Sequence, residues 1–246
     1  MKRLIVTADD VGLHRGMTEG AIRAHRDGIV TACSIVANGR EFDDAVARLR
    51  DVPALEVGVH LTMVEELALT SGQPMPKNWM RFVFASHHNL DVELRAQIEK
   101  VMATGLNVTH LNSHQHLHLF PRVFQLALHL AHQYRIKYLR RVDDHGGRAG
   151  LARRASVGAL NFFGRRAQGS NDRTIGVLEA GHLENIEPLL DHVDGVTELV
   201  THPGVNVDAY PHWRYDWEAE TRALCAPGLR EEIARRGIEL VAPSRL

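Results

Sequence analysis

The sequence is poor in several features that mark particular classes of protein. It contains only two cysteines, Cys33 and Cys225, which stand far apart and in no metal-type or redox-type spacing. This usage is typical of a reducing compartment and argues against a disulfide framework. No uncharged stretch is long enough to span a bilayer, and the N-terminal segment MKRLIVTADD lacks the apolar run of an export signal. We therefore expect a cytoplasmic protein.

The sequence also lacks an excess of either positive or negative charge. The formal net charge is −1, and no run of lysine or arginine dominates any region. A nucleic-acid partner bound by electrostatics is therefore not expected, and an anionic membrane surface is not implied. No glycine-rich phosphate loop follows the first expected strand, which disfavours a nucleotide-binding fold. No second cluster of carboxylates is present, which disfavours a two-metal phosphoester hydrolase.

What the sequence does contain is a regular alternation of short β-branched runs with longer amphipathic stretches. We expect strands at residues 3–8, 30–37, 55–61, 108–113, 136–141, 174–179, 197–202 and 237–242. We expect helices at residues 16–27, 41–50, 91–104, 122–134, 150–160, 184–193 and 217–236. This alternation predicts an α/β fold with a parallel sheet, and seven or eight such units favour a barrel of the TIM type.

Two segments, 66–90 and 143–173, show no clear period and contain clusters of Gly, Pro, Asn and Arg. Such composition is typical of connecting segments, and we expect two long loops above the barrel mouth that contact substrate. The whole chain, 1–246, is expected to form a single barrel domain.

Charged or metal-capable side chains stand at the ends of five expected strands. They are Asp9 with Asp10, His60, His114, Arg140 with Arg141, and His202. In barrels of this kind, chemistry gathers at the C-terminal ends of the strands, because the loops that leave that edge converge on one cavity. We therefore expect these side chains to share one site.

The stretch THLNSHQHLHLFP, residues 109–121, holds four histidines. If its first part is a strand, the alternation of side chains places His110, Asn112 and His114 on one face, with His114 last, at the mouth. We interpret His110 as an inward-facing residue bonded to the backbone. His114 is a candidate metal ligand, together with His60 from the preceding strand.

The two later histidines of this stretch, His116 and His118, are expected in a loop, because Pro121 starts the next helix. A competing interpretation makes His114 and His118 a helical i, i+4 pair that holds zinc. The β-branched run before them and the early proline disfavour that helix.

An Asp-His-His set with positions left for water is typical of a catalytic rather than a structural metal site. Nitrogen and oxygen donors suit zinc, while Mg²⁺, Mn²⁺, Fe²⁺ and Co²⁺ are alternatives. In a regular strand Asp9 and Asp10 face different ways, so that one can bind the metal while the other takes a proton from water. His202 is held extended by Pro203, and it could protonate a leaving amine or orient an aspartate.

Five motifs carry a family resemblance: TADDVGL at 7–13, VGVHL at 57–61, THLNSHQHLHLFP at 109–121, YLRR at 138–141 and THPG at 201–204. In their order and spacing, the sequence resembles the YdjC-like carbohydrate deacetylases over nearly the whole chain. Within that family, it is most similar to the HpnK branch, which is associated with hopanoid biosynthesis.

The resemblance implies a distorted TIM-like (β/α) barrel that removes the N-acetyl group from an acetylated amino sugar. It also implies one divalent metal ion, Mg or Zn, as cofactor. Matched residue by residue, the metal ligands would be Asp10, His60 and His114.

The remaining site residues follow from the same motifs. Asp9 would be the catalytic base, and His202 would assist the leaving group. Arg140 matches an arginine that lines the pocket and orients the base or the substrate. His116 and Glu65 would contact the substrate.

Three positions depart from the family pattern. Val11 stands where phenylalanine is usual, which would alter packing. Asn112 replaces a common aspartate, which would weaken a carboxylate that orients His114 or its neighbour. The pair Glu65-Glu66 stands where Glu-Gly is common, which would reshape the substrate loop.

The HpnK resemblance implies a hopanoid glycolipid as substrate, reached by peripheral contact at the inner face of the membrane. One alternative is a deacetylase of soluble chitooligosaccharides such as diacetylchitobiose. An alternative of another class is a non-catalytic sugar-binding barrel, whose signature would be loss of the base or of a metal ligand. Family analogy alone suggests a homodimer.

Overall fold

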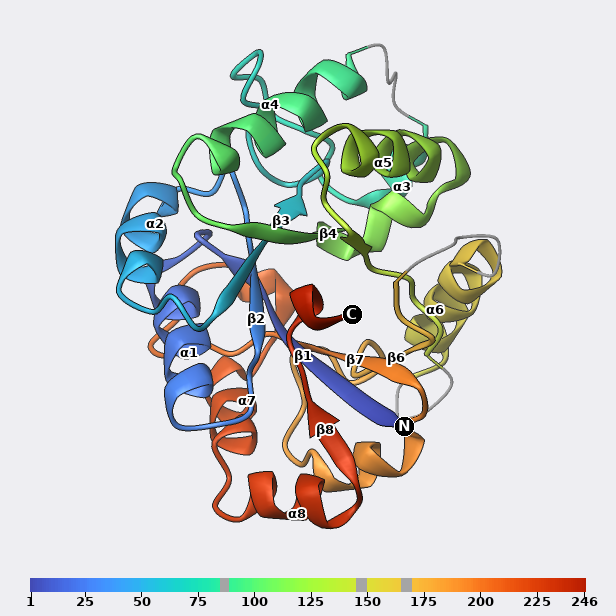
Figure 1. Cartoon of the computed structure of the whole chain (residues 1–246). Helices are drawn as coiled ribbons and strands as arrows, with labels where there is room; N and C mark the ends of the chain where they lie inside the picture. Colours follow the sequence, from blue (N-terminus) through green and yellow to red (C-terminus); the bar gives the residue numbers. More distant parts are fainter. Residues whose placement is uncertain (85–88, 145–149, 165–169) are drawn as a thin grey trace.

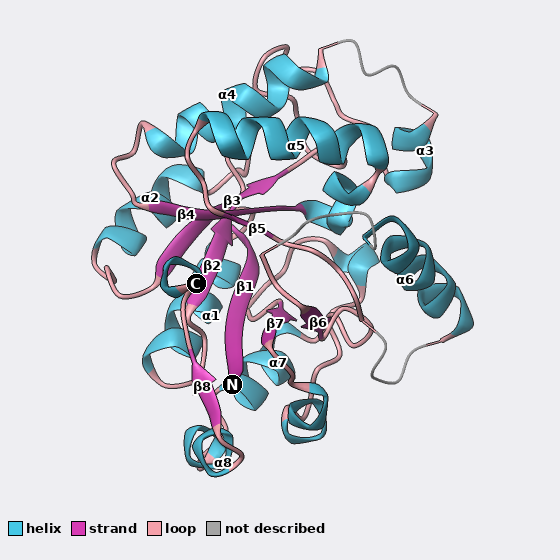
Figure 2. Cartoon of the chain, turned by 45° about the vertical axis from the view of Figure 1, so that its right-hand side comes forward, coloured by secondary structure: helices cyan, strands magenta, loops and turns pink. Residues whose placement is uncertain are grey.

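The centre of the molecule is a curled sheet of eight parallel strands, seen in Figure 1 and Figure 2. The computed structural model describes residues 1–84, 89–144, 150–164 and 170–246. The strands are β1 (Lys2–Val11), β2 (Ala32–Ile35), β3 (Glu56–Leu61), β4 (Val108–Ser113), β5 (Tyr138–Leu139), β6 (Arg173–Ile175), β7 (Val196–Thr201) and β8 (Ile238–Leu240). The prediction of an α/β barrel with seven or eight parallel strands is therefore confirmed.

The barrel is distorted, because the strand order is β5-β4-β3-β2-β1-β7-β6 and β8 pairs with β1 outside this path. β8 pairs with residues Lys2–Leu4 of β1, and β2 pairs with β1 from Thr7 onward. These two strands therefore share one edge of β1, and β7 pairs along the other edge. Hydrogen bonds outside the strand pairing link β5 and its neighbouring residues to the segment just before β6. The amide of Ser170 donates to the carbonyl of Leu139 at 3.0 Å, and the amide of Arg141 donates to Oδ1 of Asn171 at 2.8 Å.

Helices cover the outside of the sheet (Figure 2). They are α1 (Arg15–Arg26), α2 (Phe42–Arg50), α3 (Trp79–Val83), α4 (Leu90–Met102), α5 (Pro121–Gln133), α6 (Leu151–Gly164), α7 (Trp217–Leu224) and α8 (Leu229–Arg235). Among the helices that the structure describes, none combines the length and apolarity needed to cross a bilayer.

Some expected element boundaries are wrong. The helix expected at 217–236 is two helices, because the chain turns at Gly228, whose φ is 78°, and Pro227 precedes it. The helix expected at 184–193 is a short 3₁₀ turn at Glu187–His192. The expected loops are also partly helical, since 66–90 contains α3 and 143–173 contains α6. Within those loops, residues 85–88, 145–149 and 165–169 lie outside the described residues.

Side chains alternate along the strands between the helix-covered core and the inside of the curl. The core beneath the helices takes Leu4, Val6, Ala8 and Val11 from β1. The intervening side chains of β1 bond across the inside, where Thr7 Oγ1 donates to Glu198 Oε1 on β7 at 2.7 Å. On β3 and β4, His60 lies beside Asn112 in the register. This alternation directs Asp9, His60 and Asn112 to the same interior layer.

Candidate active site and metal centre

Two consecutive carboxylates, Asp9 and Asp10, line the same cavity at the C-terminal edge of the sheet. Regular alternation would have pointed them in opposite directions, and this expectation is wrong. The backbone of Asp10 has a φ of 64°, and the pairing of β1 with β2 shifts register between Ala8 and Val11. An irregularity of this kind turns one side chain away from the alternating pattern. Both carboxylates are consequently buried and available to one ligand.

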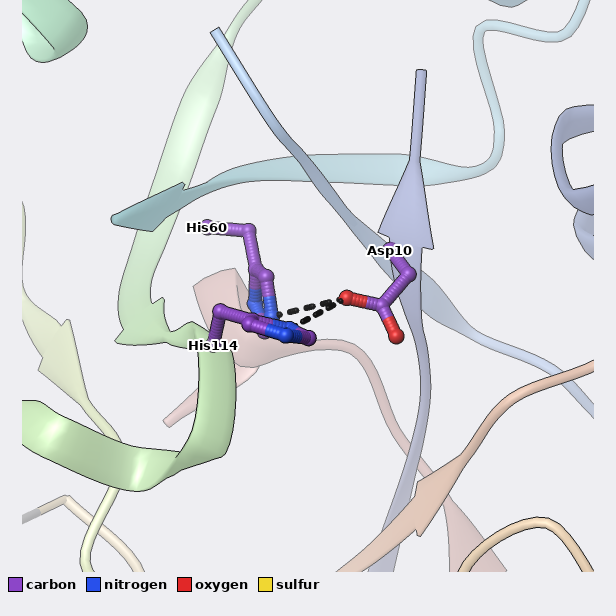
Figure 3. Close-up of side chains that lie close together, drawn as sticks. All are labelled: Asp10, His60 and His114. Carbon is purple, nitrogen blue, oxygen red and sulfur yellow. Dashed lines mark hydrogen bonds and ion pairs between the residues drawn. The ribbon is translucent and has the colours of Figure 1, made fainter. Parts of the chain in front are cut away.

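Asp10, His60 and His114 lie together as a group that could hold a metal ion (Figure 3). One potential ligand atom from each lies within 4.8 Å of the others, and all three residues are buried. Asp10 Oδ1 is 3.3 Å from His60 Nε2 and 2.9 Å from His114 Nδ1. His114 was expected as the last strand residue, but β4 ends at Ser113 and His114 begins a 3₁₀ segment, His114–Leu119.

The environment of His60 fits a cation. Its Nδ1 lies 2.7 Å from Oδ1 of Asn112, which can only accept, so Nδ1 carries the proton. Nε2 therefore presents a lone pair toward the carboxylate of Asp10, and it is buried without a hydrogen-bond partner among the described residues. Two facing lone pairs away from water are unfavourable unless a positive charge lies between them. The imidazole and carboxylate donors suit a divalent metal.

His114 is held between two carboxylates. Its Nδ1 faces Asp10, and its Nε2 lies 3.3 Å from Oε2 of Glu65. Burial opposes protonation of the ring, but Asp10 and Glu65 outweigh it and raise the pKa of His114 to about 10. A divalent cation at Nδ1 would replace that proton, so we expect proton release on metal binding.

Arg140 lies behind Asp9, fully buried. Its guanidinium donates to both carboxylate oxygens of Asp9, at 2.5 Å and 3.0 Å, and to Oε1 of Glu198 at 2.7 Å and 3.0 Å. Burial opposes ionisation of Asp9, but the guanidinium of Arg140 beside it holds the pKa of this carboxyl well below its usual range. Arg140 therefore orients and ionises Asp9.

Glu198 is a functional candidate that the sequence analysis missed. It accepts hydrogen bonds from Thr7, Arg140 and Tyr138, the last at 2.7 Å. The available signal was a lone glutamate inside the apolar strand Val196–Thr201. A buried carboxylate needs partners, and here those partners are the residues behind Asp9.

His202 follows β7 and lines the same cavity as the two aspartates. Its backbone amide donates to Oε1 of Glu220 at 2.6 Å, and its Nδ1 lies 3.9 Å from that oxygen. Burial, which disfavours the charged ring, lowers the pKa of His202.

His118 does not join the metal group. Its Nδ1 lies 2.7 Å from Oγ of Ser113, and its Nε2 lies 2.8 Å from the carbonyl of Arg140. Both ring nitrogens are thus engaged, and the helical His114–His118 pair is not formed. His116, in contrast, lines the cavity and has a φ of 54°.

His110 is an interior residue of β4, as expected, but its partners are side chains and not the backbone. Its Nε2 lies 3.1 Å from Ser34 Oγ, and its Nδ1 lies 3.0 Å from Thr109 Oγ1. Gly58 on β3 makes room for the ring, since a Cβ there would lie 2.3 Å from its Cδ2.

Asn112 replaces the common aspartate of the pattern, and it serves His60. While its oxygen accepts from His60, its amide nitrogen donates to Asp9 Oδ1 at 3.0 Å and to Ser34 Oγ at 2.8 Å. An aspartate here would lack those donors and would place a second negative charge beside Asp9. The amide therefore links a proposed metal ligand to the proposed base.

Asn112→Ala is expected to weaken metal binding about 10- to 100-fold, because His60 loses the partner that fixes its tautomer and ring orientation. Isothermal titration with Zn²⁺ measures this change. Asn107→Ala, at an exposed position, is the matched control and should leave the affinity unchanged. Equal affinities of the two variants would contradict this role for Asn112.

The cavity has a volume of about 450 Å³, within the range usual for small-molecule sites. Asn78 and Trp79 from segment 66–90 and Ser156 and Val157 from segment 143–173 form part of its wall. Trp213 and Tyr215 line it as well, and the sequence analysis missed both. The signal was the aromatic-rich run PHWRYDW at 211–217, in a chain with only 6% aromatic residues.

Comparison with known proteins gives similar chains over nearly the full length. A carbohydrate deacetylase of Brevibacillus brevis is 29% identical over 258 residues, covering 99% of each chain. A chitooligosaccharide deacetylase of Salmonella dublin is 29% identical over 251 residues, covering 95% of each.

A crystal structure from Enterococcus faecalis V583, of a "putative cellobiose-phosphate cleavage protein", has the same fold. Its TM-score is 0.76 at 23% identity, with 99% of this chain and 98% of that chain covered. The family model described as YdjC-like protein matches residues 3–235. The chain therefore belongs to the YdjC-like protein family.

Proposed function

We propose that this protein is a metal-dependent hydrolase that removes the N-acetyl group from an N-acetylglucosamine-type sugar. The observation that carries the proposal is the buried group of Asp10, His60 and His114, with Asp9 beside it in one cavity. The similar full-length proteins named carbohydrate and chitooligosaccharide deacetylases support the choice of substrate. The proposed base and the three proposed ligands are all present, which argues against a non-catalytic sugar-binding barrel.

A divalent ion, Mg or Zn, held by Asp10, His60 and His114 would polarise the acetamide carbonyl and lower the pKa of water. Asp9 would accept the proton of the attacking water. Arg140 keeps the Asp9 carboxylate ionised and fixes its orientation, so no prior proton loss is needed. The proton taken from the water would return to the leaving amine, and His202, in the same cavity, would assist that transfer, while His116 would contact the sugar.

The test is an acetate-release screen of the metal-loaded protein across N-acetylated sugars and glycolipids. We expect acetate release that a chelator abolishes and that added Zn²⁺ or Mg²⁺ restores. A protein that has bound one metal ion per chain but releases no acetate from any of these substrates would contradict the proposal. Sugar binding by such a protein would favour the non-catalytic barrel.

The finer substrate proposal is a lipid-linked sugar, in line with the motif resemblance to the HpnK branch. The segments 66–90 and 143–173, which form part of the cavity wall, also carry exposed apolar side chains close in sequence to the wall residues. On the α3 side, Met80 is 53% and Phe84 is 89% exposed, and on α6 Leu151 and Phe162 are 88% and 61% exposed. Such side chains would suit an apolar aglycone, such as a hopanoid, presented at the inner face of a membrane.

Soluble chitooligosaccharides are the second candidate substrate, favoured by the names of the similar proteins. Comparing acetate release from diacetylchitobiose with release from a hopanoid-linked N-acetylglucosamine separates the two. For the lipid-linked substrate we expect Phe84→Ser to raise KM, with no change for diacetylchitobiose. A higher kcat/KM for diacetylchitobiose, insensitive to Phe84→Ser, would overturn the lipid proposal. The homodimer stays a prediction.

A further inference from the structure

Two neighbouring glutamates after β3 bind the same loop at different points. Oε1 of Glu66 accepts from the hydroxyl of Tyr210 at 2.7 Å. Oε2 of Glu65 accepts from the indole Nε1 of Trp213 at 3.0 Å. Both contacts tie the aromatic segment 210–217 to the loop that follows β3. Only the Glu65 carboxylate also faces a residue of the metal group, His114 Nε2 at 3.3 Å.

Trp213 itself contacts the same histidine. The indole and imidazole centroids are 5.1 Å apart, and the two rings are inclined by 30°. Trp213 also lines the cavity in which the metal group lies. His114 is thus fixed at its Nε2 edge by Glu65 and over its face by Trp213, while Nδ1 points at Asp10.

The contacts of Glu65 leave little of its carboxylate for a substrate. Oε2 faces both Trp213 and His114, while Oε1 accepts from Gln115 Nε2 at 3.1 Å and lies 3.6 Å from His212 Nε2. The backbone is also held in place, because Glu65 has a φ of 70° and its amide donates to the carbonyl of Pro76 at 2.9 Å. This arrangement matches a residue that orients others.

We propose that Glu65 is a positioning residue that couples the metal ligand His114 to Trp213 in the cavity wall. The carboxylate of Glu65 orients the ring of His114 and also holds the indole of Trp213. A change at Trp213 therefore alters the orientation of His114, and a change at His114 alters the position of Trp213. The proposal rests on the metal site proposed above, and it replaces substrate contact as the role of Glu65. Glu66, which contacts the loop but is not among the partners of His114, provides the matched comparison.

The experiment compares metal affinities of the full chain by isothermal titration with Zn²⁺. Glu65→Gln is expected to weaken binding about 10- to 100-fold, because glutamine lacks the negative charge and has only one acceptor oxygen, which cannot serve both His114 and Gln115. Glu66→Gln should stay close to wild type. Circular dichroism and the Tm of each variant report whether the fold is retained.

Trp213→Phe tests the coupling from the other end, since it keeps an aromatic ring but removes the Nε1 donor. We expect about 5-fold weaker Zn²⁺ binding or more, although Trp213 is no metal ligand. In the double variant with Glu65→Gln, the indole change should add less than it does in the single variant, because its path to His114 is already weakened. Tryptophan fluorescence should respond to Zn²⁺ in the wild type and lose that response in Trp213→Phe.

The outcomes separate the two proposals. If the wild-type protein binds no divalent metal, the proposed function fails. If the wild type binds metal and Glu65→Gln matches Glu66→Gln in affinity, the coupling is overturned and the metal site stands. Strictly additive effects of Glu65→Gln and Trp213→Phe would also overturn the coupling. If Glu65→Gln does not fold, the Trp213→Phe variant decides the question. Wild-type Zn²⁺ affinity in that variant would overturn the coupling.

Discussion

Asp9→Asn is expected to lower kcat about 10²- to 10⁴-fold, the usual contribution of a positioned general base, while leaving metal affinity nearly unchanged. The amide cannot accept a proton from water, but its oxygen can still accept a hydrogen bond from Arg140. Asp9 also lies outside the group formed by Asp10, His60 and His114. The substitution therefore separates proton transfer from metal binding.

The choice of asparagine matters because of the buried charges around Asp9. Arg140 keeps its two contacts with Glu198 in this variant, so its positive charge remains paired. Removing Arg140 instead would leave the carboxylates of Asp9 and Glu198 without their cation, at a cost of about 3–5 kcal/mol. Arginine variants would therefore confound activity with folding.

Acetate release under saturating substrate measures the effect of Asp9→Asn, and Zn²⁺ titration measures metal affinity in parallel. Asp208→Asn, with a side chain 92% exposed, is the matched control and should retain wild-type kcat. Undiminished turnover in Asp9→Asn would remove the assignment of the base. Loss of metal together with activity would instead place Asp9 among the ligands.

His114→Ala is expected to weaken metal binding by more than about 100-fold, beyond the effect of losing an outer partner such as Glu65. The variant leaves only Asp10 and His60 of the group, and it removes the nitrogen that lies 2.9 Å from Asp10. Acetate release should fall with the metal content. Titration with Zn²⁺ and metal analysis of the purified protein measure the change.

The control for this variant is His129→Ala, which removes an exposed histidine from α5. It should bind one metal ion per chain with wild-type affinity. If His114→Ala also retained one tightly bound ion per chain, the proposed ligand set would be wrong. Partial rescue of activity by high Zn²⁺ concentrations would be consistent with a weakened site.

The sequence predicted the architecture well where signals are local. β-Branched runs between amphipathic segments placed all eight strands, because such runs suit buried parallel strands. Boundaries were less certain where a turn interrupts a periodic pattern, as at Gly228 between α7 and α8. The short 3₁₀ turn at Glu187–His192 likewise kept an apolar pattern without forming a full helix.

Within the site, strand ends pointed to His60, His114 and the pair Asp9-Asp10 as neighbours, and the motif resemblance implied Asp10 as the ligand. Alternation failed from Asp10 onward, because a left-handed backbone conformation cannot be inferred from an aspartate in a strand-like run. The partner of Asn112 was also undetermined, since the motif context suggested His114 or its neighbour. The register of β3 with β4 places Asn112 beside His60.

The sequence by itself determined the candidate site residues at the strand ends and which strand each one follows, because polar residues at the ends of apolar runs are a local pattern. Tertiary structure alone decided the connections among them: Glu198 behind Arg140, Asn112 beside His60, and Trp213 against His114. The first two contacts join positions 58 and 52 residues apart, and Asn112 also donates to Asp9, 103 residues away. They depend on strand register and on the path of a returning loop, and neither leaves a periodic trace in the chain.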